Sequence, residues 1–480
     1  MKLMAWMGWH PPAALAVMLL CAAGADANNL QISNVTALPG AGVPTVQFDI
    51  SWENSWRRDT DDCPAYLHDA AWVFFKVLPE SESAWKHLVL QTAGTNPANF
   101  ATGTAGAGVE LIVPQDRMGV FIRRSASNTG TGTLSSANVR VCWNMAQNGV
   151  LRTDKVRLGA LGVEMVYVAE GEFWFGDGIT ARNRDFVTLI NTTNATLAPT
   201  NVGDYYSGGY PMGGTAPASP SWPNGYRAFY MMKYMLTQGQ YVDFANMLAT
   251  AEQATNRVVT SVTNMARNTL YGSWTNFLPG AATRAFLMRW EDGVAFTDWS
   301  GLRPFTELEY EKACRGPLQP VGNEFAWGTT GIVLRTSTVG VDGSGTETYL
   351  PTSANCYAIG IYGLRVGVFA SPESTREEAG ASYWGIMDLT GNTFERAISQ
   401  TLTTFTGLHG DGALTSMGDA DVSGWPIGTG NNMVDGAGYR GGPYSVYNRL
   451  MTSDRGYAGA GASYTIGILS PGWRGARTAP

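Results

Sequence analysis

The sequence contains little charge, and lysine in particular is scarce. Charged residues make up 15% of the chain, whereas soluble proteins average about 25%. Only six of the 32 basic residues are lysines, and the formal net charge is −7. A protein that binds nucleic acid neutralises the phosphates with a stripe of lysine and arginine. Because the sequence has no such stripe, we do not expect nucleic acid as a partner.

The sequence also lacks a hydrophobic run long enough to cross a membrane. A transmembrane helix needs about 20 consecutive apolar residues, and the apolar stretch near the N-terminus covers only residues 13–23. This stretch follows Lys2 and precedes a small-x-small pattern at residues 25–27, as in a secretory signal peptide. We therefore expect residues 1–27 to be a signal peptide, no transmembrane segment, and a mature chain that is secreted, periplasmic or at the cell surface.

Cysteine is scarce as well. After the predicted signal peptide four cysteines remain, Cys63, Cys142, Cys314 and Cys356. An even number in an exported chain favours disulfides, and four cysteines allow three pairings. One bridge in each half, Cys63–Cys142 and Cys314–Cys356, is the simplest assignment. The alternative is that two or more of them are buried free thiols.

Glycine and aromatic residues, in contrast, are abundant. The 480 residues include 58 glycines, 16 tryptophans, 20 tyrosines and 18 phenylalanines. So many rings exclude a disordered chain, and so much glycine favours loops and turns over a helical bundle. At roughly 100 to 200 residues per domain, the length predicts two or three domains.

Period-two alternation dominates the first part of the chain. Residues 46–52 and 139–143 alternate apolar and polar side chains, as half-buried strands do. With four further apolar pieces between them, this predicts about seven short strands. We therefore expect a β-sandwich of immunoglobulin or fibronectin type over residues 28–160, which serves as a spacer or a binding unit because it holds no catalytic cluster.

Helix signals appear only in the second part, residues 161–480. A strand is predicted at Val163–Val168 and another at residues 228–234. Thr237 with Gln240, and Thr306 with Glu309, have the spacing of capping boxes that begin helices. The second of these helices is predicted to end at Gly316. Most of the remaining sequence reads as glycine-rich loop.

Several motifs occur in order along this second part. They include Lys233-Tyr234-Met235-Leu236-Thr237, Arg303-Pro304-Phe305-Thr306-Glu307-Leu308-Glu309-Tyr310-Glu311, Trp384-Gly385-Ile386-Met387-Asp388-Leu389-Thr390-Gly391-Asn392, Arg440-Gly441-Gly442 and Gly472-Trp473-Arg474. Together they resemble the formylglycine-generating enzyme, or sulfatase-modifying factor, family over roughly Gly162 to Thr478. The resemblance implies a loop-rich, C-type-lectin-like domain, so the expected fold class is α+β combined with all-β.

The resemblance breaks at the catalytic cysteines. In active members two cysteines shortly after the Arg-Gly-Gly motif hold copper and oxidise a sulfatase cysteine to formylglycine. Val446 and Met451 occupy these positions here. Soft thiolates bind Cu(I), and a valine side chain offers no lone pair to a metal. We therefore expect no copper and assign no catalytic residue.

The resemblance also implies a structural calcium site. The matching positions are Asp388, Gly391, Thr393 and Glu395, with two carboxylates and two backbone carbonyls as ligands. Calcium prefers six to eight oxygens, so this set suits it. The alternative is that Asp388 and Glu395 cap turns or pair with Arg396 or Arg474.

A binding face is predicted where active members have their substrate groove. Its candidates are aromatic and small polar residues, which give contact area at low entropic cost. They are His409, Asp411, Trp425, Tyr439, Tyr444, Tyr447 and Asn448. The alternative for each ring is that it fills the core.

Three functions remain open at this stage. The first is a secreted, non-catalytic binding or surface-display module whose partner is an unknown extracellular protein or glycan. The second is a formylglycine-generating oxidase, or a relative with altered chemistry. The third is an extracellular structural or filament subunit, for which self-assembly is expected.

Overall fold

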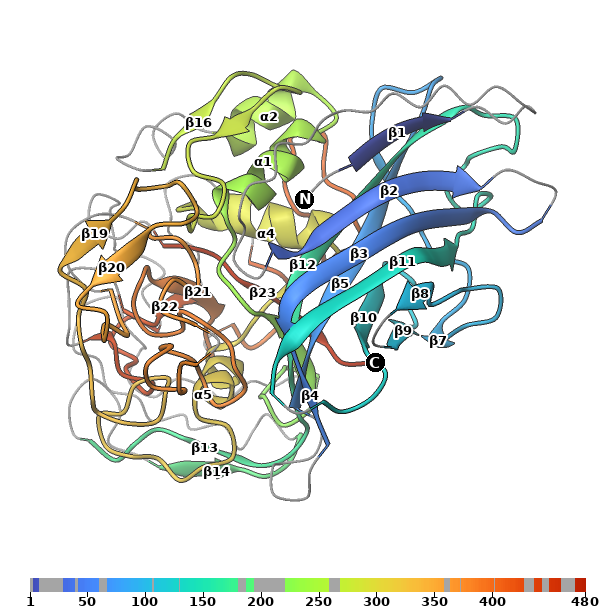
Figure 1. Ribbon diagram of the computed structural model, residues 1–480. Helices are drawn as coiled ribbons and strands as arrows, with labels where there is room; N and C mark the ends of the chain where they lie inside the picture. Colours follow the sequence, from blue (N-terminus) through green and yellow to red (C-terminus); the bar gives the residue numbers. More distant parts are fainter. Residues whose placement is uncertain are drawn as a thin grey trace.

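Figure 1 shows the computed structural model of the chain. The residues that it describes are 3–7, 29–38, 42–59, 67–105, 108–128, 130–179, 187–193, 221–258, 268–357, 363–371, 373–400, 402–426, 436–442, 449–458 and 471–480.

An eleven-stranded sheet is the largest element of the fold. Its path is β18 (Arg303–Pro304), β23 (Gly475–Thr478), β15 (Phe229–Met232), β12 (Val156–Val168), β5 (Leu67–Pro79), β10 (Val120–Arg124), β9 (Val109–Val113) and β7 (Gly94–Thr95). Three more strands pair beside this path, β1 (Leu3–Met7) with β12, and β4 (Arg57–Arg58) and β6 (Lys86–His87) with β5.

A four-stranded sheet faces the first. Its order is β2 (Gln31–Leu38), β3 (Thr45–Ser55), β11 (Gly132–Cys142) and β8 (Thr104–Ala105). Four two-stranded pairs complete the strands of the described residues. The pairs are β13 (Phe173–Phe175) with β14 (Thr188–Ile190), β16 (Leu270–Tyr271) with β17 (Leu278–Pro279), β19 (Ser337–Val339) with β20 (Thr348–Leu350), and β21 (Glu395–Ile398) with β22 (Ala437–Arg440).

Both faces of the large sheet are buried. Along β5, Val73 and Phe75 join a core shared with the four-stranded sheet, in which Phe48 of β3 lies. The alternate residues Trp72 and Phe74 point to the other face and join a core that includes residues of the helices. All 13 residues of β5 are buried, because successive side chains point to opposite faces and each face is covered.

β12 joins the two parts of the chain. It pairs with β5 from Val156 to Val166 and with β15 from Met165 to Val168. The boundary predicted between residues 160 and 161 therefore falls inside one continuous strand. The two parts share a sheet and are not connected by a linker.

Four helices occur among the described residues, α1 (Gln238–Asn246), α2 (Ala251–Arg257), α4 (Trp290–Trp299) and α5 (Glu307–Arg315). The capping boxes of Thr237 and Thr306 begin α1 and α5, which confirms both predictions. α5 gives way to Gly316, whose φ of +67° suits glycine. With few helices and many strands, the chain has the expected mixture of all-β and α+β structure.

Within the described part of the chain, no helix combines the length and the apolar character that a membrane span requires. Leu3–Met7, inside the predicted signal peptide, forms β1 against β12. The rest of that segment lies outside the described residues, and the signal peptide stays a prediction.

The predicted disulfide between Cys314 and Cys356 is not formed. Both are buried free thiols, as is Cys142. Cys314 packs in the apolar cluster of Tyr310 and Trp384, whereas Cys356 packs in a different cluster with Trp327. Each sulfur is thus enclosed by its own apolar neighbours, which is the alternative weighed from the sequence. Cys63 lies outside the described residues.

Candidate functional site

The first candidate site is the chain after the Arg440-Gly441-Gly442 motif. Val446 lies outside the described residues. Met451 is half-buried and packs against a cluster formed by Phe325, Trp327, Cys356 and Leu450. A free thiol, Cys356, therefore lies in the same cluster as one of the two positions where active members carry cysteine.

The environment of Cys356 favours the protonated thiol. Its side chain is buried and its Sγ donates to the carbonyl oxygen of Thr390 at 3.7 Å. Burial raises the pKa of this thiol, and the charge of Asp388 raises it further. A nucleophilic or metal-binding cysteine needs the opposite, a positive neighbour that stabilises the thiolate. Burial likewise raises the pKa of Cys314, to about 12.

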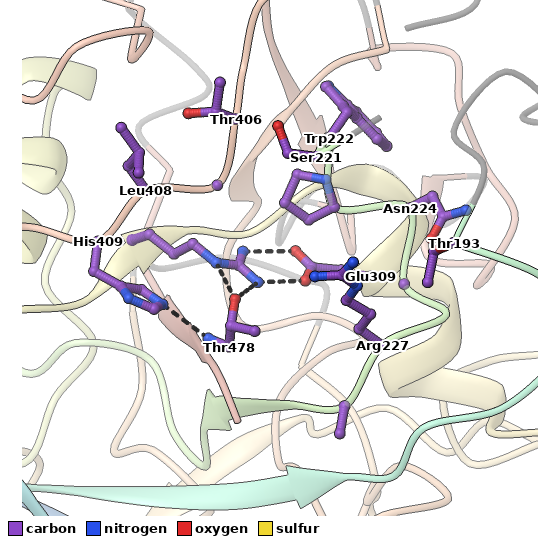
Figure 2. A pocket seen from close by; sticks show the side chains of 15 residues that line it. Thr193, Ser221, Trp222, Asn224, Arg227, Glu309, Thr406, Leu408, His409 and Thr478 are labelled. Carbon is purple, nitrogen blue, oxygen red and sulfur yellow. Dashed lines mark hydrogen bonds and ion pairs between the residues drawn. The ribbon is translucent and has the colours of Figure 1, made fainter. Parts of the chain in front are cut away.

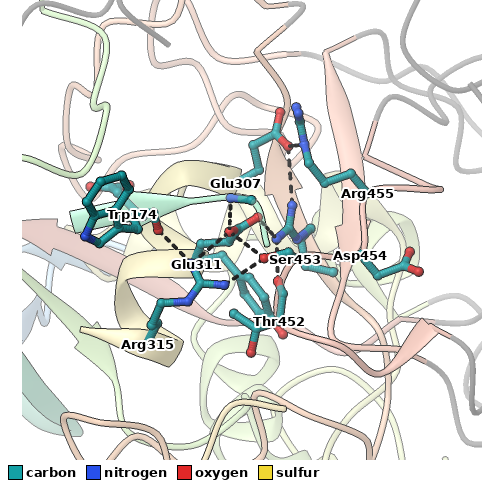
Figure 3. Close-up of polar contacts among 12 residues, drawn as sticks. Trp174, Glu307, Glu311, Arg315, Thr452, Ser453, Asp454 and Arg455 are labelled. Atoms are coloured by element: carbon teal, nitrogen blue, oxygen red, sulfur yellow. Dashed lines mark hydrogen bonds and ion pairs between the residues drawn. The ribbon is translucent and has the colours of Figure 1, made fainter. Parts of the chain in front are cut away.

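A buried network of charges supports the segment that contains Met451. Glu311 of α5 accepts from Arg440 Nη2 at 2.8 Å and from the Ser453 hydroxyl at 3.0 Å. Glu307, one helical turn earlier, accepts from Arg455 Nε at 2.8 Å (Figure 3). Burial raises the pKa of Glu311, but Arg440 and Arg315 outweigh it and the pKa is lowered. The network therefore holds residues 452–455 against α5.

Sequence reasoning named Glu307 and Glu311 only as parts of a motif. The signal that predicts their joint role is the i, i+4 spacing of two carboxylates, which places both on one face of the helix. Arg315, four residues after Glu311, is one partner. The other two arginine partners, Arg440 and Arg455, lie 129 and 148 residues further along the chain. The pairing with these two arginines is therefore not visible from the local sequence.

The predicted calcium residues are occupied by other contacts. Both carboxylate oxygens of Glu395 accept from Arg474, Oε2 from Nε at 2.8 Å and Oε1 from Nη2 at 2.5 Å. Neither side chain is exposed. The guanidinium thus supplies the positive charge that a cation would supply, and it would repel one. This is the alternative weighed from the sequence, in which Glu395 pairs with Arg474.

The carboxylate of Asp388 is also engaged by the chain. Asp388 Oδ2 accepts the N–H of Gly367 at 2.7 Å, and burial raises the pKa of Asp388 to about 6. The N–H of Gly391 donates to Gly441 at 2.8 Å, and Thr393 Oγ1 accepts the N–H of Gly472 at 2.8 Å. The last two contacts do not involve the carbonyl oxygens of Gly391 and Thr393, which are the predicted ligands, so the mismatch with calcium rests on the two carboxylates and the site stays a prediction.

Two aromatic residues of the predicted binding face, Trp425 and Tyr439, are buried. Trp425 is 5% exposed, donates its indole N–H to Leu408, and belongs to the large core. Tyr439 is 6% exposed and packs with Phe394 in a separate cluster. Both therefore fill the core, which is the alternative given for each ring from the sequence. Tyr444, Tyr447 and Asn448 lie outside the described residues.

The remaining two candidates lie in polar surroundings. His409 Nε2 accepts the N–H of Thr478 at 3.0 Å, and Nδ1 lies 3.5 Å from Asp116. Burial lowers the pKa of His409 to about 3, so the ring is neutral. Asp411 is exposed and forms a cluster with Asp298 and Asp421, whose carboxylates lie within 4.8 Å of one another. Burial raises the pKa of Asp298 to about 7.

His409 also lines a pocket of about 270 Å³, which we call the Arg227 pocket (Figure 2). Its residues come from five segments that are far apart in the sequence. They are Thr193, Ser221, Trp222, Pro223, Asn224, Gly225, Arg227, Ala228, Arg303, Glu309, Thr406, Gly407, Leu408, His409 and Thr478. Of these, sequence reasoning proposed only His409 as a binding residue.

A buried ion pair lies at this pocket. Arg303 donates to Glu309 Oε2 at 2.9 Å and to Oε1 at 2.6 Å, and it also donates to Thr478 Oγ1 at 3.3 Å. Figure 2 shows Glu309 between His409 and Arg227. Glu309 also caps α5 by accepting the N–H of Thr306, so the start of the helix and the pocket are built from the same residues.

Comparison with known proteins covers most of this part of the chain. Residues 160–455 match the model of a family described as the sulfatase-modifying factor enzyme 1-like domain. The search of curated proteins gave no match.

Proposed function

This chain belongs to the sulfatase-modifying factor family, and we propose that it uses the family's fold as an exported binding module without the family's thiol oxidation. The observation that carries this proposal is the pair Val446 and Met451, which occupies the positions of the copper-binding cysteines. The oxidation needs thiolates, because soft sulfur ligands hold Cu(I). The partner we propose is an extracellular protein or glycan.

The described thiol nearest in packing to Met451 gives further support. Cys356 is buried, protonated by its surroundings and bonded to a backbone carbonyl. Such a cysteine behaves as a small apolar residue and is chemically inert.

We also propose that residues 28–160 form a sandwich of immunoglobulin or fibronectin type that carries the second part. Support comes from the strand order: β2, β3 and β11 are neighbours in one sheet, and β10, β5 and β12 are neighbours in the other. The shared core between the two sheets gives a rigid support.

The second candidate function is an oxidase with altered chemistry. The observation in its favour is that Cys356 and Met451 bring a thiol and a thioether to one cluster, and both are soft ligands. Conversion of a Cys-x-Pro-x-Arg peptide by the purified chain with copper, abolished in Cys356→Ser, would establish it.

The binding function is tested by screening the purified mature chain against glycans and surface proteins. We expect a saturable ligand, and no conversion of the Cys-x-Pro-x-Arg peptide with or without copper. Peptide conversion that depends on copper would overturn the proposal. Light scattering over a range of concentrations tests the third function, a structural or filament subunit, because assembly raises the apparent mass with concentration.

A further inference from the structure

The charges that line the Arg227 pocket do not cancel. Its lining contains two arginines and one glutamate, Arg227, Arg303 and Glu309. Arg303 and Glu309 neutralise each other in a bidentate ion pair, and neither side chain is more than 2% exposed. The His409 ring is neutral because its pKa is about 3. One positive charge, that of Arg227, is left over in a chain whose net charge is −7.

Arg227 is available for a ligand. Its side chain is exposed at the pocket, and no hydrogen bond or ion pair joins it to another residue of the described chain. Figure 2 shows the Arg227 side chain directed toward Glu309. A guanidinium offers two parallel N–H groups, which match the two oxygens of a carboxylate.

A second polar group at the pocket is unsatisfied. The hydroxyl oxygen of Thr406 is buried and has no hydrogen-bond partner among the described residues. A buried hydroxyl without a partner costs roughly 1 to 3 kcal/mol, so such groups are usually satisfied by a ligand or by water. Thr406 comes from a different segment than Arg227, but its hydroxyl oxygen has almost no accessible surface, so Arg227 is the polar anchor that a ligand in the pocket can reach.

The size and the walls of the pocket limit the ligand. Drug-sized ligands occupy pockets of about 300 to 1,000 Å³, so a pocket of about 270 Å³ suits a smaller molecule. Trp222, Pro223 and Leu408 give it apolar walls. A single guanidinium balances one negative charge, which favours a carboxylate over a phosphate dianion.

We propose that the Arg227 pocket binds a small organic carboxylate, about the size of one sugar ring, through the Arg227 guanidinium. This inference rests on the proposed binding function and names a ligand class for it. Two classes of ligand carry such a carboxylate group, an acidic sugar and the C-terminal end of a peptide.

Calorimetric titration of the mature chain at physiological salt tests the proposal. The probes are D-glucuronate, its uncharged analogue D-glucose, and N-acetyl-leucine as a peptide end. We expect one or both carboxylates to bind, and D-glucose to bind at least about 10-fold more weakly because a charge-assisted hydrogen bond is lost. The stronger of the two carboxylates identifies the source.

Two variants and a matched control locate the site. Arg227→Gln removes the charge from an exposed side chain and should weaken carboxylate binding at least about 10-fold. Thr406→Val keeps the shape of the wall and should leave carboxylate affinity unchanged, because the hydroxyl oxygen that it removes is enclosed. The control Arg140→Gln removes an exposed arginine from β11 of the other sheet and should leave the affinity unchanged. Circular dichroism and melting temperature verify that each variant is folded.

Three results would overturn the inference. They are no binding of either carboxylate, equal binding by the chain and by Arg227→Gln, and equal weakening by Arg140→Gln. If the glycan and protein screen finds a ligand that Arg227→Gln still binds, the inference fails while the binding function stands. Copper-dependent conversion of the sulfatase peptide would instead remove the binding function itself.

Discussion

The guanidinium of Arg474 forms an ion pair with Glu395 at the position where the family resemblance predicts a bound cation. Family resemblance assigns this carboxylate to calcium, yet Arg474 bonds both of its oxygens in a fully buried place. The positive charge that the carboxylate requires is thus part of the chain. The local sequence around Glu395 cannot reveal this, because Arg474 lies 79 residues away.

We predict that calcium leaves the stability unchanged and that Arg474→Leu is severely destabilising. Removal of one partner of a buried pair leaves an uncompensated charge and costs about 3 to 5 kcal/mol. The control Lys155→Leu breaks the exposed pair with Glu80 and should change the free energy of unfolding by less than about 1 kcal/mol. Denaturant unfolding with calcium and with EDTA measures both, and a clear rise of the melting temperature with calcium would contradict the ion-pair interpretation.

The carboxylates of Asp298, Asp411 and Asp421 predict a dependence on pH. Burial raises the pKa of Asp298 from 3.8 to about 7, and the two exposed aspartates add to this rise. Between these pH values the folded chain holds a proton that the unfolded chain has released. The contribution of Asp298 to stability is therefore fully present below about pH 4 and is lost as the pH rises through about 7.

We therefore expect Asp411→Asn with Asp421→Asn to stabilise the chain at pH 8 and not at pH 4. Two like charges about 4 Å apart repel by about 1 kcal/mol even in water, which sets the scale of the gain at pH 8. Denaturant unfolding at the two pH values, with EDTA present, measures it. Glu53→Gln, an exposed control on β3, should show no such difference. Equal stability of the double variant and the parent at pH 8 would contradict the repulsion.

At the level of elements, the sequence predicts those whose signals are local. The capping boxes of Thr237 and Thr306 place two helices correctly, because the cap and its partner lie three residues apart. α4 was not predicted, since all ten of its residues, the polar ones included, are buried and no polar face is turned to solvent. The alternation in β5 is likewise hidden, because both of its faces meet apolar cores.

In α4 we predict that replacing a glycine by alanine lowers the stability of the protein, although helix propensity alone predicts a gain. Gly293→Ala within a helix normally stabilises by about 1 kcal/mol. Here a methyl group at Gly293 would overlap the indole ring of Trp473, so we expect destabilisation by about 1 to 3 kcal/mol. Thermal unfolding measures it. Ala251→Gly at the exposed start of α2 is a control that should follow propensity, and a more stable Gly293→Ala variant would contradict the close packing of Trp473.

At the scale of the whole molecule, the sequence predicted the family and the order of its two parts, and missed how they join. Motifs such as Arg303-Pro304-Phe305-Thr306 carry the family resemblance, which the match over residues 160–455 confirms. The join depends on β12, whose two partners come from residues 67–79 and 229–232. Pairing over such separations has no local signature, and neither has the Arg227 pocket with its five separate segments.

The shared sheet predicts that the chain unfolds as one unit. Scanning calorimetry should show a single transition whose calorimetric and van't Hoff enthalpies agree, because the large core contains residues from both parts. Two separated transitions would contradict the continuity of β12. Truncation at residue 161, which removes β5 and half of β12, should yield an insoluble product, because unpaired strand edges self-associate.

The continuity of β12 also bears on how such a chain can change by recombination. A crossover at its midpoint would have to preserve the hydrogen-bonding register on both flanks of the strand, with Ala160 opposite Phe75 and Met165 opposite Met232. Replacement of the residues before this point by an unrelated domain would therefore replace half of a strand. The sequences of the two parts of the chain are expected to change together in evolution, because each contributes to the pairing of β12.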